Sequence, residues 1–247
     1  MSHSVISLGL GLGGGKSATS SGAPGGGGAL ENIYSVLFDG VNDKAPSDSN
    51  ADLASATAWT LTAWFKTSDT DGGKEAIVGF GAGSPYFVIR TENTYTQMRE
   101  QTYTTNIGEH STSGWNFAAV YQSNDTTIKG MLNGGSWVAK AQVQNGASVI
   151  QATYGANPVA VGVGPYGSHY FPGGIDEVAY WNTALSESDL EAIYNSGVPK
   201  DISSYNPISW WRMGDNNSGS GTTITDMGSG SNDLTLVNGP AFQTDVP

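Results

Sequence analysis

The sequence contains no cysteine, which excludes both a disulfide framework and a thiolate metal site. Basic residues are also scarce: the 247 residues include ten Lys and Arg against 22 Asp and Glu, for a formal net charge of −12. A chain this acidic lacks the positive surface that binds a polyanion, so we expect no nucleic acid partner. The three histidines fall in no metal-ligand spacing and no nucleophilic motif.

Charged residues make up only 13% of the chain, about half the usual share of ~25%, whereas Gly, Ser, Thr and Asn are abundant. No apolar run approaches membrane-spanning length, and the first residues lack the basic region of a secretory signal. We expect no membrane insertion. The composition favours an exposed, assembly-forming or extracellular β protein over a cytosolic enzyme.

The composition divides the chain into an N-terminal arm, residues 1–28, and a domain, residues 29–247. The arm holds ten of the 35 glycines and one charged side chain, Lys16. Such a segment has no core of its own and is typical of a linker or tail. It also carries a short apolar thread that could add to a groove or a sheet edge of a partner. That thread is formed by Val5, Ile6, Leu8, Leu10 and Leu12.

The domain is dominated by short segments of alternating apolar and polar residues, separated by turn residues. Such segments predict strands that each bury one face against an opposing sheet. Asn133-Gly134 predicts a tight turn that requires positive φ. The expected strands include 34–39, 59–66, 76–80, 86–90, 117–121, 128–132, 159–163 and 175–181.

The residues after the last of these strands predict one short helix. Ser186 is the expected N-cap, Asp189 stands three residues later in the capping-box position, and Leu185 can pack on Leu190 as a hydrophobic staple. Leu190, Ile193 and Tyr194 form one apolar stripe. Gly197 is the expected left-handed stop.

The segment from Gly173 to Gly197, GGIDEVAYWNTALSESDLEAIYNSG, resembles the closing signature of laminin-G-like, concanavalin A-like jelly-roll domains. YSVLFDGVND and WTLTAWFK resemble the first two strands of that family, and Trp115 to Gly135 resembles its hairpin. The resemblance covers roughly residues 33–240. It implies an all-β protein: a two-sheet antiparallel jelly-roll sandwich with one short capping helix, here preceded by the glycine-rich arm.

The tail segment from Ile208 to Pro240 follows the helix, an order similar to that of laminin-G-like structural proteins of bacteriophage virions. The resemblance therefore implies a non-enzymatic virion protein, a capsid decoration or appendage, docked through its arm onto other virion proteins and forming a homo-oligomer. The alternative is a secreted or surface carbohydrate-binding module, calcium-dependent or not. A host-attachment lectin that binds surface glycans on a virion would combine the two. The expected location is the virion or, for the alternative, the extracellular space.

Glycanases of this fold require a separate test of the acidic residues. Retaining hydrolysis needs two carboxyl groups about 5 Å apart. The nearest equivalent here is Asp176-Glu177, whose side chains would point to opposite faces of a regular strand. We therefore expect no enzyme activity.

Calcium is the one cofactor that the residues suggest. Asp39, Asn42 and Asp43 fall in one turn, and the family fold places Asp176 on a neighbouring strand, so oxygen ligands of the kind Ca²⁺ prefers could gather there. The competing interpretation is that these side chains bond the backbone of their own turn. Asp215 and Asp226 are weaker metal-ligand candidates in loops equally suited to turns.

Exposed aromatic side chains are the expected glycan contacts, since they stack on sugar rings. The candidates are Trp137 and the cluster Tyr166, His169 and Tyr170, although aromatics of a sandwich are more often core. Trp59, Trp115 and Trp210 are expected in the core.

Overall fold

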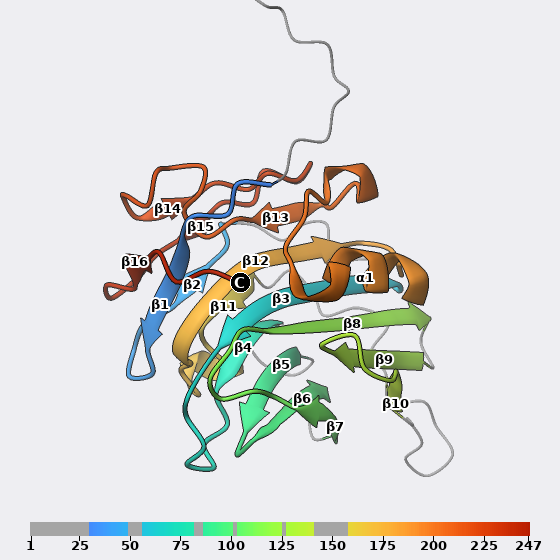
Figure 1. Ribbon diagram of the computed structural model, residues 1–247. Coiled ribbons are helices and arrows are strands. Elements are labelled where there is room, and N and C mark those ends of the chain that lie inside the picture. The colour runs from blue at the N-terminus through green and yellow to red at the C-terminus, as the bar shows by residue number, and fades with distance from the viewer. Residues whose placement is uncertain (1–29, 49–55, 82–85, 101–102, 125–126, 141–157) are drawn as a thin grey trace, which may run out of the picture.

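The computed structural model describes residues 30–48, 56–81, 86–100, 103–124, 127–140 and 158–247. The described residues form two stacked antiparallel sheets, which confirms the predicted sandwich (Figure 1). The arm residues Val5, Ile6, Leu8, Leu10 and Leu12 lie outside the described residues. No helix in the described part of the chain has the length and apolar character needed to cross a bilayer.

The larger sheet has eight strands in the order β10-β9-β8-β3-β12-β1-β16, with β13 also pairing with β12. Its central strand β12 is the predicted IDEV strand, flanked by β3 and β1. In sheet order the strands are β10 (Val138–Lys140), β9 (Thr127–Leu132), β8 (Asn116–Asn124), β3 (Trp59–Lys66), β12 (Pro172–Trp181), β1 (Ser35–Asp39), β16 (Ala241–Gln243) and β13 (Ser209–Trp211).

The smaller sheet has six strands in the order β2-β11-β4-β5-β6-β7. These strands are β2 (Ala45–Pro46), β11 (Val159–Val161), β4 (Ala76–Phe80), β5 (Phe87–Glu92), β6 (Tyr95–Glu100) and β7 (Tyr103–Glu109). A separate two-stranded sheet pairs β14 (Thr223–Ile224) with β15 (Leu234–Thr235). The helical elements are α1 (Glu187–Tyr194), η2 (Pro165–Gly167), η3 (Asn195–Gly197) and η4 (Ser203–Tyr205).

The main core lies between the two sheets and is built around aromatic side chains. Trp59 of β3 meets Phe80 edge-on at a ring-centroid distance of 5.0 Å and Phe87 at 4.7 Å. All three side chains are buried, and such pairs stabilise the core beyond the area they bury. The prediction that Trp59 is a core residue is confirmed.

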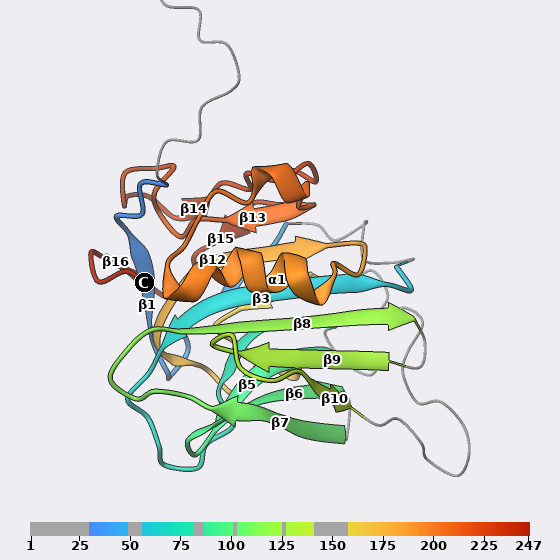
Figure 2. The same ribbon diagram turned by 45° about the vertical axis from the view of Figure 1, so that its right-hand side comes forward.

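Helix α1 covers the outer face of the larger sheet, as Figure 2 shows. The Ser186 hydroxyl accepts a hydrogen bond from the Asp189 amide at 3.1 Å, so the predicted N-cap is confirmed. Leu190 and Ile193 are buried in a second apolar cluster on this face, which also contains Trp210. Trp115 is only half-buried and donates to Asp245, so its assignment to the core was wrong.

The helix ends earlier than the glycine stop predicted. Asn195 takes the left-handed conformation at φ 49°, and its amide donates to the Glu191 carbonyl. Asparagine tolerates this conformation because its short polar side chain can bond locally, and here its side-chain amide donates to the Val198 carbonyl. Gly197, at φ 95°, then lies in the following 3-10 turn.

A β-bulge interrupts β12 between Asp176 and Ala179. Ile175 and Val178 both enter the main core, so Glu177 is the extra residue, and it adopts φ 45°. Asp176 accepts from the Asn32 side-chain amide at 3.0 Å, whereas Glu177 accepts from Trp210 and, at 3.1 Å, from Arg212. The expectation that the two carboxyls face opposite sides of the strand was therefore wrong, because the bulge breaks the alternation.

A buried ion pair joins β10, at the edge of the larger sheet, to β6 of the smaller sheet. Lys140 Nζ lies 3.1 Å from Glu100 Oε2, and both side chains are 1% exposed. Burial lowers the pKa of Lys140, and the nearby Glu100 carboxylate opposes that shift.

The buried carboxyl of Glu177 predicts a measurable pH dependence of stability. Burial raises its pKa to about 7, against the opposing effect of the Arg212 cation. Because the folded-state value exceeds the ordinary 4.5, its contribution to stability is complete below about pH 4.5 and is lost as the pH rises through about 7. Between pH 5 and 8, the free energy of unfolding should fall less in Glu177→Gln than in the native protein, by on the order of a few kcal/mol.

Urea denaturation at half-unit pH steps measures this effect. Asp176→Asn serves as a comparison, since burial also raises the pKa of Asp176. A pH profile of Glu177→Gln that runs parallel to that of the native protein would contradict the prediction.

Candidate functional site

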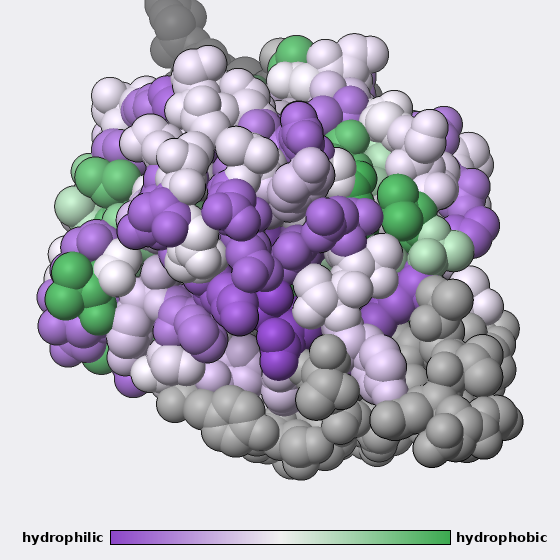
Figure 3. Space-filling model, turned by 90° about the horizontal axis from the view of Figure 1, so that it is seen from below, coloured by the Kyte–Doolittle hydropathy of each residue, from purple (hydrophilic) through white to green (hydrophobic). Residues whose placement is uncertain are grey.

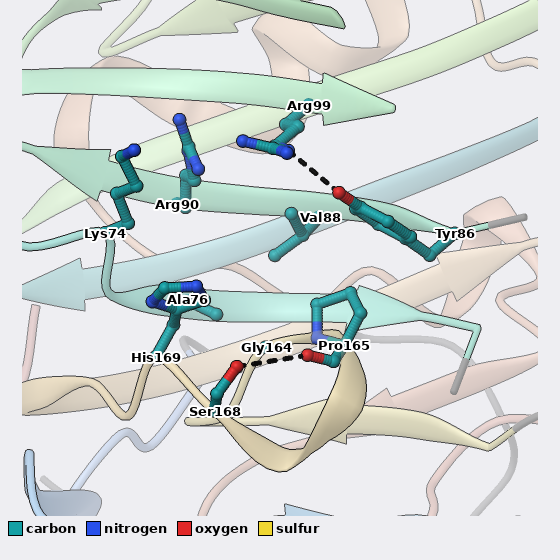
Figure 4. Close-up of a pocket in the computed structure, with 10 residues that line it drawn as sticks. All are labelled: Lys74, Ala76, Tyr86, Val88, Arg90, Arg99, Gly164, Pro165, Ser168 and His169. Atoms are coloured by element: carbon teal, nitrogen blue, oxygen red, sulfur yellow. Dashed lines mark hydrogen bonds between the residues drawn. The ribbon is translucent and has the colours of Figure 1, made fainter. Parts of the chain in front are cut away.

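A pocket of about 170 Å³ opens on the outer face of the smaller sheet, the face turned away from the main core. Figure 4 shows Lys74, Arg90 and Arg99 along one side of it, with Val88 in the middle and the 164–169 loop opposite. The whole lining consists of Lys74, Ala76, Tyr86, Val88, Arg90, Arg99, Gly164, Pro165, Ser168 and His169. Seen from below, the centre of the molecule is mostly hydrophilic and apolar residues form separate spots nearer the margin (Figure 3).

The alternation of side chains along β5 and β6 places the cations on one side of the pocket. On β5, Phe87 and Ile89 enter the main core, so the intervening Val88 and the next residue, Arg90, face outward. Arg99 of β6 stands directly across the ladder from Val88. Neighbouring strands therefore place two guanidinium groups on either side of one apolar side chain.

The opposite side of the pocket comes from the loop between β11 and β12. The Gly164 amide donates to the Ser168 carbonyl at 2.8 Å and the Gly167 amide to the Gly164 carbonyl at 3.2 Å, so the loop closes into a compact turn around η2. His169 follows at φ 62°. Its carbonyl accepts from the Ala76 amide at 3.0 Å, which fixes the loop against β4 beside the pocket.

Hydrogen bonds hold the two arginines in place. Arg99 Nε donates to the Tyr86 hydroxyl at 2.9 Å, and the guanidinium carbon lies 5.9 Å from the centre of the tyrosine ring. Arg90, which is 4% exposed, donates from Nε to Gln97 at 2.8 Å and from Nη2 to Glu92 at 2.9 Å. These contacts orient the charged groups before any ligand arrives.

The electrostatics of the pocket are positive. Burial, followed by the Arg99 cation, lowers the pKa of Arg90, and Glu92 opposes this effect. Burial also lowers the pKa of His169, and Arg90, Lys74 and Arg99 all add to that decrease. Burial and these three cations thus both favour the neutral form of His169, and the same cations attract an anion.

A second pocket of about 350 Å³ continues the first along the same sheet face. The two share Gly164 and Pro165, and the second extends over the small residues Gly79 and Ala160 toward Lys44. None of the described residues that line either pocket is acidic. We call these two neighbouring pockets together the sheet groove; Lys74, Arg90 and Arg99 make one end of it strongly cationic.

The predicted glycan-contact residues separate into two places. His169 lines the sheet groove at its rim, and Tyr170 is next to it, with its hydroxyl donating to the Gly167 carbonyl at 3.0 Å. Tyr166 lies in η2, but its side chain is outside the described part of the structure. Trp137 lies apart from them: it packs on Tyr121 at 5.5 Å and donates to Glu191 of α1.

Of the predicted calcium ligands, Asp39, Asn42 and Asp43 share one turn, whereas Asp176 lies apart from them. The Asp39 carboxylate accepts the amides of Val41, Asn42 and Asp43 at 2.8, 3.1 and 3.2 Å, which is the turn interpretation. The Asp43 carboxylate accepts the Asp39 amide at 3.0 Å. Asp39 pairs with Pro172 of β12, so Asp176 lies about 13 Å further along that strand at ~3.3 Å per residue.

The weaker metal candidates also hold backbone groups. Asp215 accepts the amides of Ile33 and Tyr34, both at 2.9 Å, and Asp226 accepts those of Trp210 and Asn232. A different acidic group in the described residues, Asp69, Asp71 and Glu75, has carboxylate oxygens within 4.8 Å of one another. Asp69 and Asp71 each accept an amide of their own loop.

Comparison with known proteins identifies the fold family. Residues 39–191 match the family model Laminin_G_3, described as the concanavalin A-like lectin/glucanases superfamily. The chain belongs to this family. No curated protein matches the sequence.

Several solved structures are similar to this chain at low sequence identity. A crystal structure of a Bacteroides ovatus protein, described as a candidate carbohydrate-binding protein, is 16% identical with a TM-score of 0.65, covering 88% of this chain and 62% of its own. A heptameric SAP-like pentraxin from Limulus polyphemus is 11% identical with a TM-score of 0.51, covering 69% and 89%. The sialidase module CBM40 of Ruminococcus gnavus, bound to α2,3-sialyllactose, is 16% identical with a TM-score of 0.48, covering 64% and 96%.

Positive potential in the pocket can be tested through His169. The pKa of His169 should lie below the ordinary value of 6.5, and Lys74→Ala should raise it, because one of the cations that disfavour imidazolium is removed. NMR titration of the ring protons measures both values. Lys129→Ala removes a lysine that pairs with Glu187 on the other sheet and should leave the pKa of His169 unchanged. An unshifted His169 in Lys74→Ala would contradict the prediction.

Proposed function

We propose that the protein is a non-catalytic carbohydrate-binding domain whose ligand lies in the sheet groove. The observation that carries the proposal is the pocket on the outer face of the smaller sheet, where apolar and ring surfaces adjoin fixed polar groups. Ligand sites generally combine an apolar lining with a few well-placed polar groups. Carbohydrates present both kinds of surface, since C–H faces alternate with hydroxyl groups around each ring.

The lining suits this chemistry residue by residue. The Tyr86 ring, Val88 and Pro165 offer apolar surface, while Arg99 and Ser168 offer hydrogen-bonding groups beside it. The second pocket lengthens the site along the sheet, which suits an oligosaccharide better than a compact metabolite. The same sandwich occurs in the Bacteroides ovatus protein described as a candidate carbohydrate binder, which is consistent with this use of the fold.

The acidic residues support binding without hydrolysis. Glycoside hydrolysis ordinarily requires a pair of carboxyl groups that flank the scissile bond. The described lining of the sheet groove contains none, and the Asp176 and Glu177 carboxyls are buried against Asn32, Trp210 and Arg212. Calcium binding at the Asp39 turn stays a separate proposal, independent of the groove.

Filling the groove should abolish carbohydrate binding. Ala160 of β11 faces outward between the core residues Val159 and Val161 and lines the second pocket. Ala160→Trp should reduce binding of glycans retained on an array by about 10-fold or more, because the indole occupies the space of a sugar ring. Ala139→Trp is the matched control, since Ala139 is exposed on β10 of the other sheet.

Calorimetric titration with each retained glycan gives the two affinities. Equal affinities for Ala160→Trp and the native protein would place the ligand elsewhere. Failure of the native protein to retain any glycan would overturn the proposed function.

A virion role is retained as a second proposal, favoured by the apolar thread at residues 5–12. The arm would anchor the protein on a bacteriophage particle, and the sandwich would face outward. Electron microscopy of particles containing the chain should then show residues 1–28 packed against another subunit, and deletion of these residues should prevent incorporation. Normal incorporation of the deleted chain would contradict docking through the arm.

A further inference from the structure

We infer that the ligand of the sheet groove is an acidic glycan, with one carboxylate or sulfate group bound between Lys74, Arg90 and Arg99. The inference rests on the proposed function and names the class of sugar that the groove selects. It follows from where the few cations of this chain are placed, how they are held and what surrounds them.

Basic residues are concentrated in the groove far beyond their share of the sequence. The chain has ten Lys and Arg, and four of them, Lys44, Lys74, Arg90 and Arg99, line its two pockets. Four others form ion pairs on the larger sheet or its tail segment, namely Lys66 with Asp245, Lys129 with Glu187, Lys140 with Glu100, and Arg212 with Glu177 and Asp215.

The carboxylates nearest the pocket cations lie outside the described pocket lining. Glu92 is shared between Arg90, at 2.9 Å, and Lys74, at 3.9 Å. Glu75 bonds to Thr91, and burial raises its pKa. Asp69 and Asp71 lie beside Glu75, with carboxylate oxygens within 4.8 Å of one another. The described lining of the pocket contains the three cations and no carboxylate, and Arg90 is nearly fully buried. Clustered positive charge in a partly dehydrated site costs free energy, and an anion bound there offsets that cost.

The geometry suits an anionic group attached to a ring. The Tyr86 hydroxyl fixes Arg99 and Gln97 fixes Arg90, so the planar donors are oriented for oxygen acceptors before binding. An inorganic anion would bind through these cations alone and would make no apolar contact. The adjoining Val88 and Pro165 surfaces add apolar contact that fits the body of a sugar.

The charge of the whole protein limits the ligand to few anionic groups. At physiological salt, charges separated by more than ~8 Å are largely screened, so the local cations attract one nearby anion despite the net charge of −12. A long polyanion would extend beyond the cationic end and meet an acidic surface. We therefore expect a short glycan, or a glycan end, that carries a single acidic sugar.

A glycan array that contains matched neutral, carboxylated and sulfated members tests the inference. Lactose, 3′-sialyllactose and 3′-sulfolactose form one such set, and neutral and uronic-acid oligosaccharides form another. Native protein should retain acidic members over their neutral counterparts by about 10-fold or more, the range of a charge-assisted hydrogen bond. Comparison of carboxylated with sulfated members then identifies the anionic group.

Lys74→Glu and Arg99→Gln should each remove this preference without unfolding the protein, as melting temperature will verify. Lys74 is solvent-exposed, so its exchange leaves the core intact. Lys200→Glu is the matched control: it makes the same change in net charge beside Tyr205, on the α1 side of the larger sheet, and should leave the preference unchanged.

Three results would overturn the inference. Equal retention of neutral and acidic members, with loss of both in Ala160→Trp, would leave the proposed function standing and remove only the acidic preference. An acidic preference that survives both Lys74→Glu and Arg99→Gln would place the anion outside this pocket. Retention of no glycan at all would overturn the proposed function together with the inference.

Discussion

The pocket on the smaller sheet depends on the strict alternation of side chains along β5 and β6. Phe87, Ile89 and Met98 are buried in the main core. The residues that alternate with them, Val88, Arg90 and Arg99, face outward and line the pocket. A slip of one residue in register would carry Arg90 into the core and expose two large apolar side chains. Burial of the aromatic core therefore fixes the position of the cations, and the site is as rigid as the sandwich that supports it.

Different structures lie on the two outer faces of the sandwich. The larger sheet is covered by α1 and the tail segment, which bury a second apolar cluster that includes Leu190, Ile193 and Trp210. The outer face of the smaller sheet carries the two pockets instead, with small residues such as Ala160 and Gly79 in the lining. Gly79 has a structural reason to be small, because an added Cβ would lie 2.5 Å from the Phe87 carbonyl oxygen.

Sequence patterns predicted the architecture better than the site. Alternation and capping residues locate strands and helix because these signals are local: Ser186 caps α1 as expected. The bulge at Glu177 was missed because nothing in the alternation marks it, and its cause lies in long-range partners such as Arg212. His169, a predicted glycan contact, lines the pocket, whereas Arg90 and Arg99 were not predicted because their meeting depends on the pairing of β5 with β6. The alternating apolar residues of those strands were the one local signal that their neighbours face outward.

The buried pair of Lys140 and Glu100 gives the sandwich a preferred alignment of its layers. Each side chain is 1% exposed and they come from different sheets. Sliding one sheet over the other would disrupt the aromatic contacts between them. It would also leave the charges of Lys140 and Glu100 buried without a partner, which is several kcal/mol less favourable than the native pairing. The pair thus fixes the alignment of the two sheets. Arg99 is fixed with it, because Arg99 stands next to Glu100 on β6.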